Sequence, residues 1–404
     1  MSDEKPDRTD AEKPVGSLAA PAPAGTEPEP EPAPAPSPDP EVAPRPARQW
    51  VSMRSGSLDL RVGAGALPAL AHALRTSAGR PHVCALVHES LAPADAVRTL
   101  RDHLSAEGFE VRPIELAERA CSMEAALALD ARLGEARVTS DDVVVAVGGH
   151  QTLSMASFAC SSWCGGVPLA LVPTDLPSAL VSAVTPRALD VAGQPRMVSQ
   201  DGMARYLAVD EALLACDLAG EKGRLACALM AQVACCESDR TFGRLWDGVD
   251  ELLSGDLAAR AERLQDGVKM RGKVAASASA ATRQSLEFGT TFAHVLRALA
   301  PQVDAGTALA DGMRFAARLS VALGTLEIDE MLTIDELLAR LGLDTARADV
   351  SPADLAAGLR EERYRRTNRF MLALPRALGR VRLAVVTDEL LAEHAAAWCA
   401  SRPE

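Results

Sequence analysis

The sequence predicts an α/β fold in which a doubly wound parallel sheet precedes an all-helical domain. Short apolar, β-branched runs alternate with helical patterns from about Val51 to Thr174, and long segments of helical periodicity follow from about Leu213. Strands that alternate with helices are joined by right-handed crossovers and form a parallel sheet. Ligands of such sheets bind at the carboxyl ends of the strands.

Residues 1–48 differ from the rest of the chain because Pro, Ala and Glu dominate them. This composition buries too little apolar area to offset the entropy of folding, so we predict a disordered tail. We favour a solvated extension without chemical consequence over a spacer or docking arm. The remaining chain is predicted to form an α/β domain over 49–210 and a helical domain over 211–404.

The composition excludes several classes of protein. The net charge is −13 and no run is rich in Lys or Arg, so we expect neither nucleic acid nor a membrane surface as a partner. Nine scattered cysteines, an odd number, favour buried thiols in a reducing cytoplasm. No apolar run reaches the roughly 18 residues that span a bilayer, and no signal-peptide pattern is present. We therefore expect a cytoplasmic protein.

The elements of the α/β domain follow one another regularly along the chain. VSMRSGSLDLRV predicts a strand, and Gly63 and Gly65 predict the turn that leads into a helix. Further helices are predicted over 93–107 and 123–133. The other strands are predicted at HVCALVHES, FEVRPIEL, DDVVVAVGGH and PLALVPT. After Leu213 nearly every segment has helical periodicity, and RVRLAVV from Arg380 predicts a short strand before the final helix.

A few residues are candidates for chemistry. Gly148 and Gly149 close a strand and open a helix, where backbone N–H groups can hold a phosphate, although a tight turn in an ordinary βα unit explains them equally well. No HExxH and no paired CxxC occur, and Cys160 with Cys164 reads as two core thiols. His294 follows Thr290 by one helical turn and is favoured as a packed or capping residue over a ligand.

Several segments between Leu58 and Ala397 together resemble the 3-dehydroquinate synthase family. The segments, in chain order, are RVGAGAL, AERACS, VVVAVGGHQTLS, VPTDLPSALVSAV, LEFGTTFAH and AGTALADGM. The resemblance implies a Rossmann-like sheet domain followed by a helical domain. It also implies the family's reaction, which converts a seven-carbon phosphorylated keto acid into the ring of 3-dehydroquinate with NAD and a divalent metal, usually zinc.

The resemblance assigns roles to particular positions. It places Gly148, Gly149, Glu118 and Thr174 on the nucleotide side. It places Lys269, Arg283 and His294 at the substrate phosphate and carboxylate. Arg187 stands where the family has a Lys that contacts the substrate. The alternative for this second set is ordinary surface charge and one packed histidine.

Other positions depart from the family pattern. The family's metal ligands, one Glu and two His, correspond to Met230, Thr290 and Ala305, with Gln232 as the alternative to Met230 if the register shifts by two. These side chains cannot replace a carboxylate and two imidazoles around zinc, so we predict a metal-free site. His150 stands where the family has a third glycine, and its side chain is predicted to obstruct a pyrophosphate.

Three hypotheses about function follow from the resemblance and the departures. The preferred one is a diverged homologue in aromatic amino acid biosynthesis that has lost the metal-dependent reaction and acts as a non-catalytic partner or regulator. The second is an active synthase, or a related cyclase or lyase, with an altered site. The third is a sensor that grips a phosphorylated or other anionic small molecule with Arg187, Lys269 and Arg283. Family relatives often pair, so a homodimer is also expected.

Overall fold

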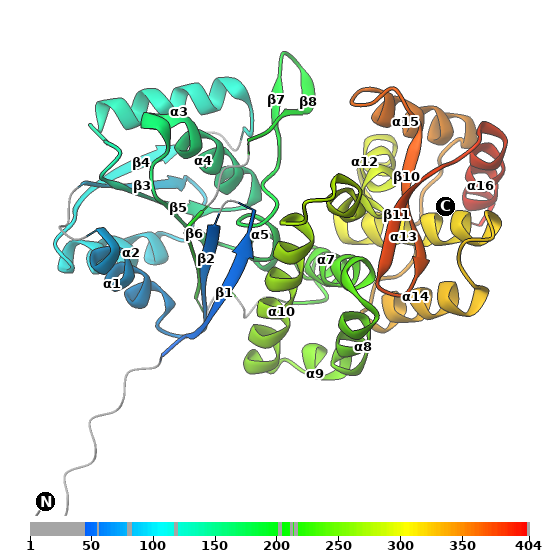
Figure 1. Cartoon of the computed structure of the whole chain (residues 1–404), viewed down its shortest axis with the longest axis horizontal. Coiled ribbons are helices and arrows are strands. Elements are labelled where there is room, and N and C mark those ends of the chain that lie inside the picture. Colours follow the sequence, from blue (N-terminus) through cyan, green and yellow to red (C-terminus); the bar gives the residue numbers. More distant parts are fainter. Residues whose placement is uncertain are drawn as a thin grey trace, which may run out of the picture. The chain divides into compact units, whose positions relative to one another are not determined.

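The computed structural model describes residues 45–54, 56–78, 83–116, 120–200, 204–210, 213 and 217–401 (Figure 1). Residues Ala43–Glu404 form one compact unit. Both predicted domains, 49–210 and 211–404, lie within this unit, and the division between them stays a prediction. The predicted tail lies outside the described residues except at its end, where Ala47 and Arg48 begin the first strand.

A seven-stranded sheet forms the amino-terminal half, in the order β1-β2-β9-β6-β5-β3-β4. Neighbouring strands are parallel except β1 and β2, which form an antiparallel hairpin where the sequence predicted one strand. The interior strands β5 and β6 are buried at every residue, as their continuous apolar sequences require. The strand bounds are β1 Ala47–Met53, β2 Gly56–Val62, β3 Val83–Glu89, β4 Glu110–Leu116, β5 Val143–Gly148, β6 Leu169–Pro173 and β9 Tyr206–Val209.

Helices cover both faces of this sheet (Figure 1). On one face α1 (Ala66–Ala78) and α2 (Ala94–Ala106) share a buried cluster with Val145, and on the other α3 (Met123–Glu135) and α4 (His150–Ser162) share a cluster with Val144. Val144 and Val145 point to opposite faces because side chains alternate along a strand. The predicted doubly wound sheet is therefore confirmed.

The carboxyl-terminal half is mainly helical, as predicted. Its helix α7 has buried residues along almost its whole length and packs against α10 and α13. The helices are α7 Glu221–Glu237, α8 Asp239–Asp247, α9 Val249–Leu253, α10 Leu257–Ala275, α11 Ala280–Arg283, α12 Thr290–Leu299, α13 Ala305–Ala322, α14 Ile328–Arg340, α15 Pro352–Tyr364 and α16 Asp388–Ala400. The predicted strand from Arg380 is confirmed as β11 (Arg380–Val385), and it pairs with β10 (Met371–Ala377), which the sequence analysis missed.

A second hairpin, which the sequence analysis also missed, joins the two halves. Its strands are β7 (Leu189–Val191) and β8 (Gln194–Val198), and it projects from the sheet half (Figure 1). The two loop residues, Ala192 and Gly193, have φ of 48° and 75°. Positive φ at both central residues is the geometry of the type I′ turn that fits the twist of paired strands.

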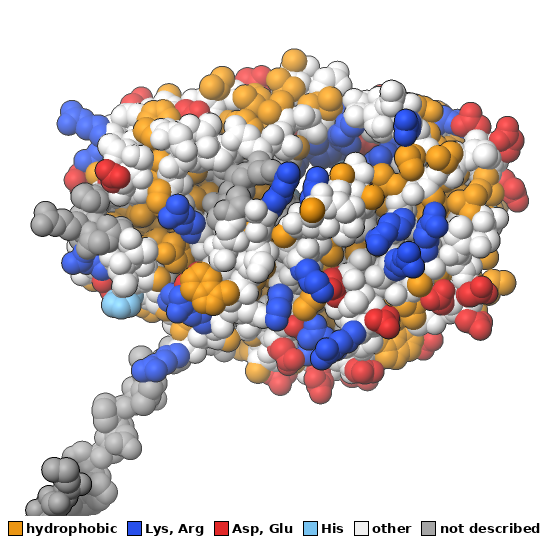
Figure 2. Space-filling model, in the orientation of Figure 1, with side chains coloured by type: hydrophobic (Ala, Val, Ile, Leu, Met, Phe, Trp, Pro, Cys, Tyr) orange, Lys and Arg blue, Asp and Glu red, His pale blue; other side chains and the backbone are white. Residues whose placement is uncertain are grey.

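The surface carries both signs of charge. On the face shown in Figure 2, basic and acidic side chains are interspersed, and no continuous basic area covers it. Across the described part of the chain, no helix has both the length and the apolar character needed to cross a bilayer. Cys160 is buried and Cys164 exposed, and both thiols are free.

Gly289 provides a test of how tightly the helical half is packed. It has φ of 77°, and a Cβ added there would lie 2.8 Å from the Leu309 carbonyl oxygen and the Met313 nitrogen of α13. We expect Gly289→Ala to lower the free energy of unfolding by about 2–4 kcal/mol, because a strained backbone adds to overpacking. Urea unfolding measures this.

Gly324→Ala is the matched control. Gly324 also has positive φ, 66°, but a Cβ there meets no atom within 4 Å, so only the backbone strain of about 1 kcal/mol is expected. Equal losses in the two variants would contradict the close approach of α12 and α13.

Candidate functional site

The carboxyl ends of β3, β5 and β6 meet helices from both halves at one edge of the sheet. These strands end at Glu89, Gly148 and Pro173, and α4 and the short α5 (Leu176–Val181) begin directly after two of them. From the helical half, α7 and α10 pack against α5. Parallel sheets bind their ligands at this edge, so the candidate site is sought here.

The glycine turn between β5 and α4 is occupied by a carboxylate of the chain itself. Glu89, 4% exposed, accepts a hydrogen bond from the Gly149 N–H at 3.3 Å and another from the Thr152 hydroxyl at 2.8 Å. A Cβ on Gly148 would lie 3.2 Å from the Glu89 carboxyl carbon, so glycine is needed for this approach. The positive end of α4 is thus already facing an anion.

His150, the first residue of α4, points toward the helical half. Its Nδ1 lies 3.0 Å from the Ser182 hydroxyl, just beyond α5. Burial, together with the positive charges of Arg271 and Arg187, lowers the pKa of His150 to about 4. The imidazole is therefore neutral at pH 7.

Arg271 on α10 places a guanidinium in the interior beside His150. The side chain is 9% exposed, its Nε donates to the Thr185 hydroxyl at 2.7 Å, and its Nη1 donates to the Gln232 amide oxygen at 3.0 Å. Burial lowers its pKa to about 10, and no carboxylate among the described residues offsets this. Arg271 is thus a charged group at pH 7 held by neutral acceptors.

Two glycines allow α10 to pack closely enough to bury Arg271. A Cβ on Gly267 would lie 2.7 Å from the Leu180 side chain of α5, and one on Gly272 would lie 2.5 Å from the Val51 side chain of β1. The helix can therefore approach α5 and β1 more closely than a helix with side chains at these positions. The approach buries the base of Arg271 between the two halves.

Gln232 connects the guanidinium to α12. Its side chain is 1% exposed, and its amide nitrogen donates to the Phe288 carbonyl at 2.7 Å and to the Thr290 hydroxyl at 3.1 Å. With its amide oxygen on Arg271, every polar atom of this side chain has a partner. Thr185, Arg271, Gln232 and Thr290 thus form one continuous chain of hydrogen bonds.

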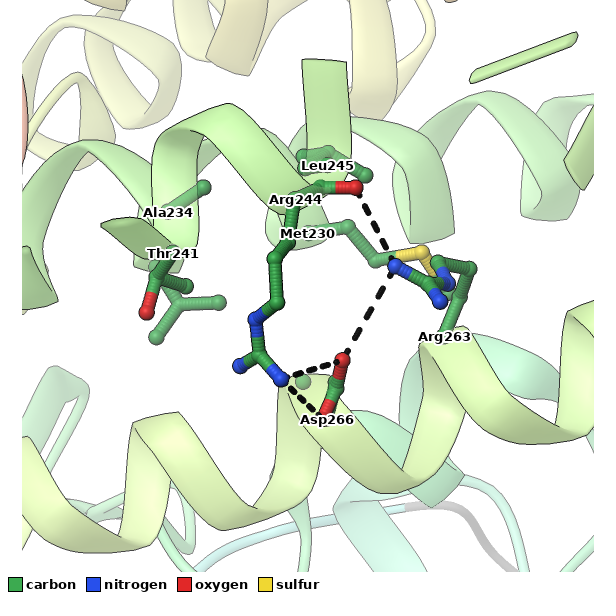
Figure 3. Close-up of a pocket in the computed structure, with 9 residues that line it drawn as sticks. Met230, Ala234, Thr241, Arg244, Leu245, Arg263 and Asp266 are labelled. Carbon is green, nitrogen blue, oxygen red and sulfur yellow. Dashed lines mark hydrogen bonds and ion pairs between the residues drawn. The ribbon is translucent and has the colours of Figure 1, made fainter. Parts of the chain in front are cut away.

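The other two positions that correspond to family ligands lie elsewhere. Met230 lines a small cavity with Arg244, Arg263 and Asp266 (Figure 3). Ala305 is the first residue of α13. Gln232, the alternative register, is therefore the α7 residue that contacts Thr290.

These residues do not fit a divalent metal ion. Gln232 and Thr290 offer no anionic or imidazole ligand, and a guanidinium beside them would repel a cation. Nowhere in the described ranges do three His, Cys, Asp or Glu side chains cluster as a metal site would require.

The turn does not fit a pyrophosphate either. The Glu89 carboxylate would repel it, and the first N–H of the turn is already engaged. Thr174 is half-buried after β6, and its N–H donates to the Gly148 carbonyl at 3.1 Å. Glu118, the remaining predicted nucleotide contact, lies outside the described residues.

The three cations predicted to grip an anion have different surroundings. Arg187 Nη2 donates to both carboxylate oxygens of Asp190, at 2.8 and 3.1 Å, and Nη1 donates to the Cys121 carbonyl. Arg283 donates to two backbone carbonyls at the end of α10. Lys269 is exposed on α10. Two of the three cations therefore have structural acceptors within the chain.

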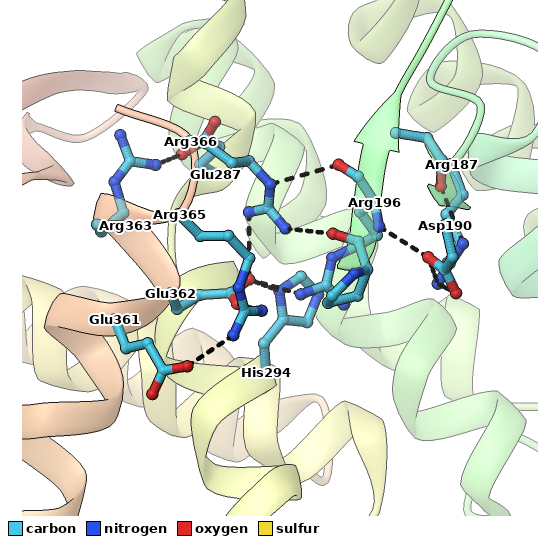
Figure 4. Close-up of polar contacts among 12 residues, drawn as sticks. Arg187, Asp190, Arg196, Glu287, His294, Glu361, Glu362, Arg363, Arg365 and Arg366 are labelled. Carbon is cyan, nitrogen blue, oxygen red and sulfur yellow. Dashed lines mark hydrogen bonds and ion pairs between the residues drawn. The ribbon is translucent and has the colours of Figure 1, made fainter. Parts of the chain in front are cut away.

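His294 belongs to a cluster centred on Glu362 of α15 (Figure 4). The Glu362 carboxylate, 8% exposed, contacts His294 Nδ1 at 3.1 Å, Arg366 and Arg365 at 3.2 Å, and Arg196 from β8. Burial alone would raise the pKa of Glu362, but the His294 hydrogen bond and the charges of Arg196 and Arg366 lower it to about 2. This carboxylate therefore fastens the β7–β8 hairpin to the helical half.

Sequence reasoning missed Arg271, Glu89, Glu362 and Arg196. Arg271 stands in a helix segment rich in charge, where a solvated side chain is the ordinary expectation. The run EERYRR at 361–366 was the available signal for the Glu362 cluster, because a mixed-charge run seldom contains a buried acid unless it is paired. Glu89 ends a buried strand, and its position at the sheet edge was the signal there.

Comparisons with known proteins match both halves of the chain. A model described as 3-dehydroquinate synthase N-terminal matches residues 112–216, and one described as 3-dehydroquinate synthase C-terminal matches residues 226–363. The 3-dehydroquinate synthase of Halorhodospira halophila is 27% identical over 352 residues, covering 85% of this chain and 96% of the relative. That of Thermobifida fusca is 34% identical over 120 residues, 29% of this chain and 32% of the relative.

Solved structures share the fold. A 2-epi-5-epi-valiolone synthase from Streptomyces hygroscopicus subsp. jinggangensis, with NAD+ and Zn2+ bound, has a TM-score of 0.71 at 18% identity and covers 87% of this chain and 99% of its own. A 2-deoxy-scyllo-inosose synthase complexed with carbaglucose-6-phosphate, NAD+ and Co2+ has a TM-score of 0.74 at 16% identity, covering 86% and 99%. The predicted fold class is confirmed.

Glu362→Gln tests the cluster that holds the hairpin. Because the pKa of Glu362 falls from 4.5 to about 2 on folding, its carboxylate stabilises the fold above pH 4.5 and this contribution is lost as the pH falls toward about 2. At pH 7 we expect the variant to lose about 3 kcal/mol of unfolding free energy. Urea unfolding at a series of pH values measures both.

The difference between wild type and Glu362→Gln should shrink below pH 4.5, the ordinary value of the carboxyl. Glu361→Gln is the control, because Glu361 is 75% exposed and pairs only with Arg365. We expect it to change stability by less than about 1 kcal/mol. A difference for Glu362→Gln that does not vary with pH would contradict the lowered pKa.

Proposed function

Because this chain belongs to the 3-dehydroquinate synthase family, we propose that it is a member that has lost the metal-dependent cyclisation and acts as a non-catalytic partner or regulator. The family supports a place in aromatic amino acid biosynthesis. The chemistry of the site supports the loss of the metal step.

The observation that carries the proposal is the hydrogen-bonded chain through Arg271. A metal in such a site would polarise a substrate hydroxyl, and it would need anionic or imidazole ligands to stay bound. Here Gln232 uses its amide oxygen to hold a guanidinium and its amide nitrogen to bond Thr290. The positive charge at this place therefore belongs to the Arg271 side chain and not to a bound metal ion.

The glycine turn supports the same conclusion from a second place. A transient oxidation by NAD needs the dinucleotide bound at the amino end of α4, and Glu89 already holds the Gly149 N–H there. His150, hydrogen-bonded to Ser182, fills the position of the family's third glycine with a side chain. Both changes disfavour the pyrophosphate.

Retained catalysis is the rival proposal, and the extent of the match favours it. The similarity to the Halorhodospira halophila synthase covers 96% of that relative, so no large part of an active enzyme is missing. An active form would need a reaction that proceeds without the metal ligands named above. A measurement of metal content and turnover decides between the two proposals.

The test is a paired measurement of metal content and turnover. We expect the purified chain, equilibrated with zinc and passed through a desalting column, to retain far less than one zinc per chain by mass spectrometry. With NAD, zinc and the seven-carbon phosphorylated substrate, we expect no phosphate release above the buffer rate. The ligand set is too weak for zinc, and the turn is blocked.

The Halorhodospira halophila synthase, handled identically, is the positive control for both readings. Stoichiometric zinc in this chain, or phosphate release at a rate near that of the control, would overturn the proposal and favour the active enzyme.

A further inference from the structure

The guanidinium of Arg271 has hydrogen-bonding capacity that the protein does not use. An arginine has five N–H groups, and those of Arg271 that have partners are Nε–H, on Thr185, and one N–H of Nη1, on Gln232. The Nη2 group and the second N–H of Nη1 have no acceptor among the described residues. These unused N–H groups, the free edge of the guanidinium, can donate charge-assisted hydrogen bonds to a carboxylate or phosphate.

The charges around Arg271 also lack a balancing anion. His150 is kept neutral by burial and by the nearby positive charges of Arg271 and Arg187. Asp175, the acid that acts on His150, already pairs with Lys222 at 3.0 Å, and Asp190 pairs with Arg187. A buried cation held only by neutral acceptors is costly, and one added anion would offset that cost.

Further polar groups lie around Arg271, some of them partly exposed. The hydroxyl of Ser182 and the neutral imidazole of His150 lie on the sheet side, and the hydroxyl of Thr290 lies on the helical side. His150, Thr185 and Thr290 are half-buried, so the polar rim is open to water. The site is at the carboxyl end of a parallel sheet, where such folds bind small molecules.

We propose that Arg271 binds the carboxylate or phosphate group of a small molecule through its free guanidinium edge. The proposal rests on the proposed function, because it needs the metal to be absent from this place. It differs from the sequence-based sensor hypothesis in the residue that grips the anion, since Arg187 and Arg283 already serve acceptors within the chain. The anion would neutralise a buried cation that has no carboxylate partner among the described residues.

The test is binding of two simple probes, inorganic phosphate and malonate, followed by calorimetry and by thermal unfolding at constant ionic strength. We expect one of them to bind the wild type and raise its melting temperature. Arg271→Gln should weaken that binding by about tenfold or more, because it removes charge-assisted hydrogen bonds. Arg271→Lys should recover only part of it, because a point charge lacks the planar edge. The preferred probe separates a phosphate site from a carboxylate site.

Lys273→Gln is the matched control. Lys273 lies on the same helix two residues further on, its side chain is 71% exposed, and it pairs with Glu237. We expect it to bind the probe as the wild type does.

Two results would overturn this inference: no binding of either probe to the wild type, or equal binding to the wild type and Arg271→Gln. The proposed function fails separately, through stoichiometric zinc or phosphate release. Failure of the anion test alone, with no zinc bound and no turnover, would contradict this inference and leave the proposed function standing.

Discussion

The buried guanidinium of Arg271 links the two halves at the candidate site. It bonds Thr185, which follows α5 in the sheet half, and Gln232 of α7, which in turn bonds Thr290 of α12. A cation buried without an acid costs several kcal/mol, so the surrounding packing must hold it in place. The close approach of α10 at Gly267 and Gly272 provides that packing.

Two carboxylates show how the fold manages the other charges near this edge of the sheet. Glu89 lies at the amino end of α4, where helix donors and the helix dipole favour a negative charge. Glu362 forms ion pairs with several cations, and its pair with Arg196 links the β7–β8 hairpin to α15. Both acids use donors or cations that a bound anion would otherwise use, whereas Arg271 keeps its free edge. The contrast singles out Arg271 as the group available for a ligand.

The sequence predicted the parts of this structure that depend on local pattern. The apolar runs at β5 and β6 identified interior strands, and motif similarity located Thr290 at the start of α12. The sequence did not determine whether Met230 or Gln232 contacts Thr290, because that depends on which face of α7 packs against α12. Arg271 was missed because its burial comes from two glycines that fit against Leu180 and Val51, contacts between segments far apart in the chain.

The central claim is that the positions corresponding to the family's metal ligands hold no metal ion, because Gln232 bonds both Thr290 and the guanidinium of Arg271. A crystal structure grown with excess zinc, with anomalous data collected at the zinc edge, tests it most directly. We expect no anomalous peak beside Gln232 and Thr290, and continuous density from Arg271 to the Gln232 amide. A zinc peak between Gln232 and Thr290, with the Arg271 side chain turned away, would contradict the claim.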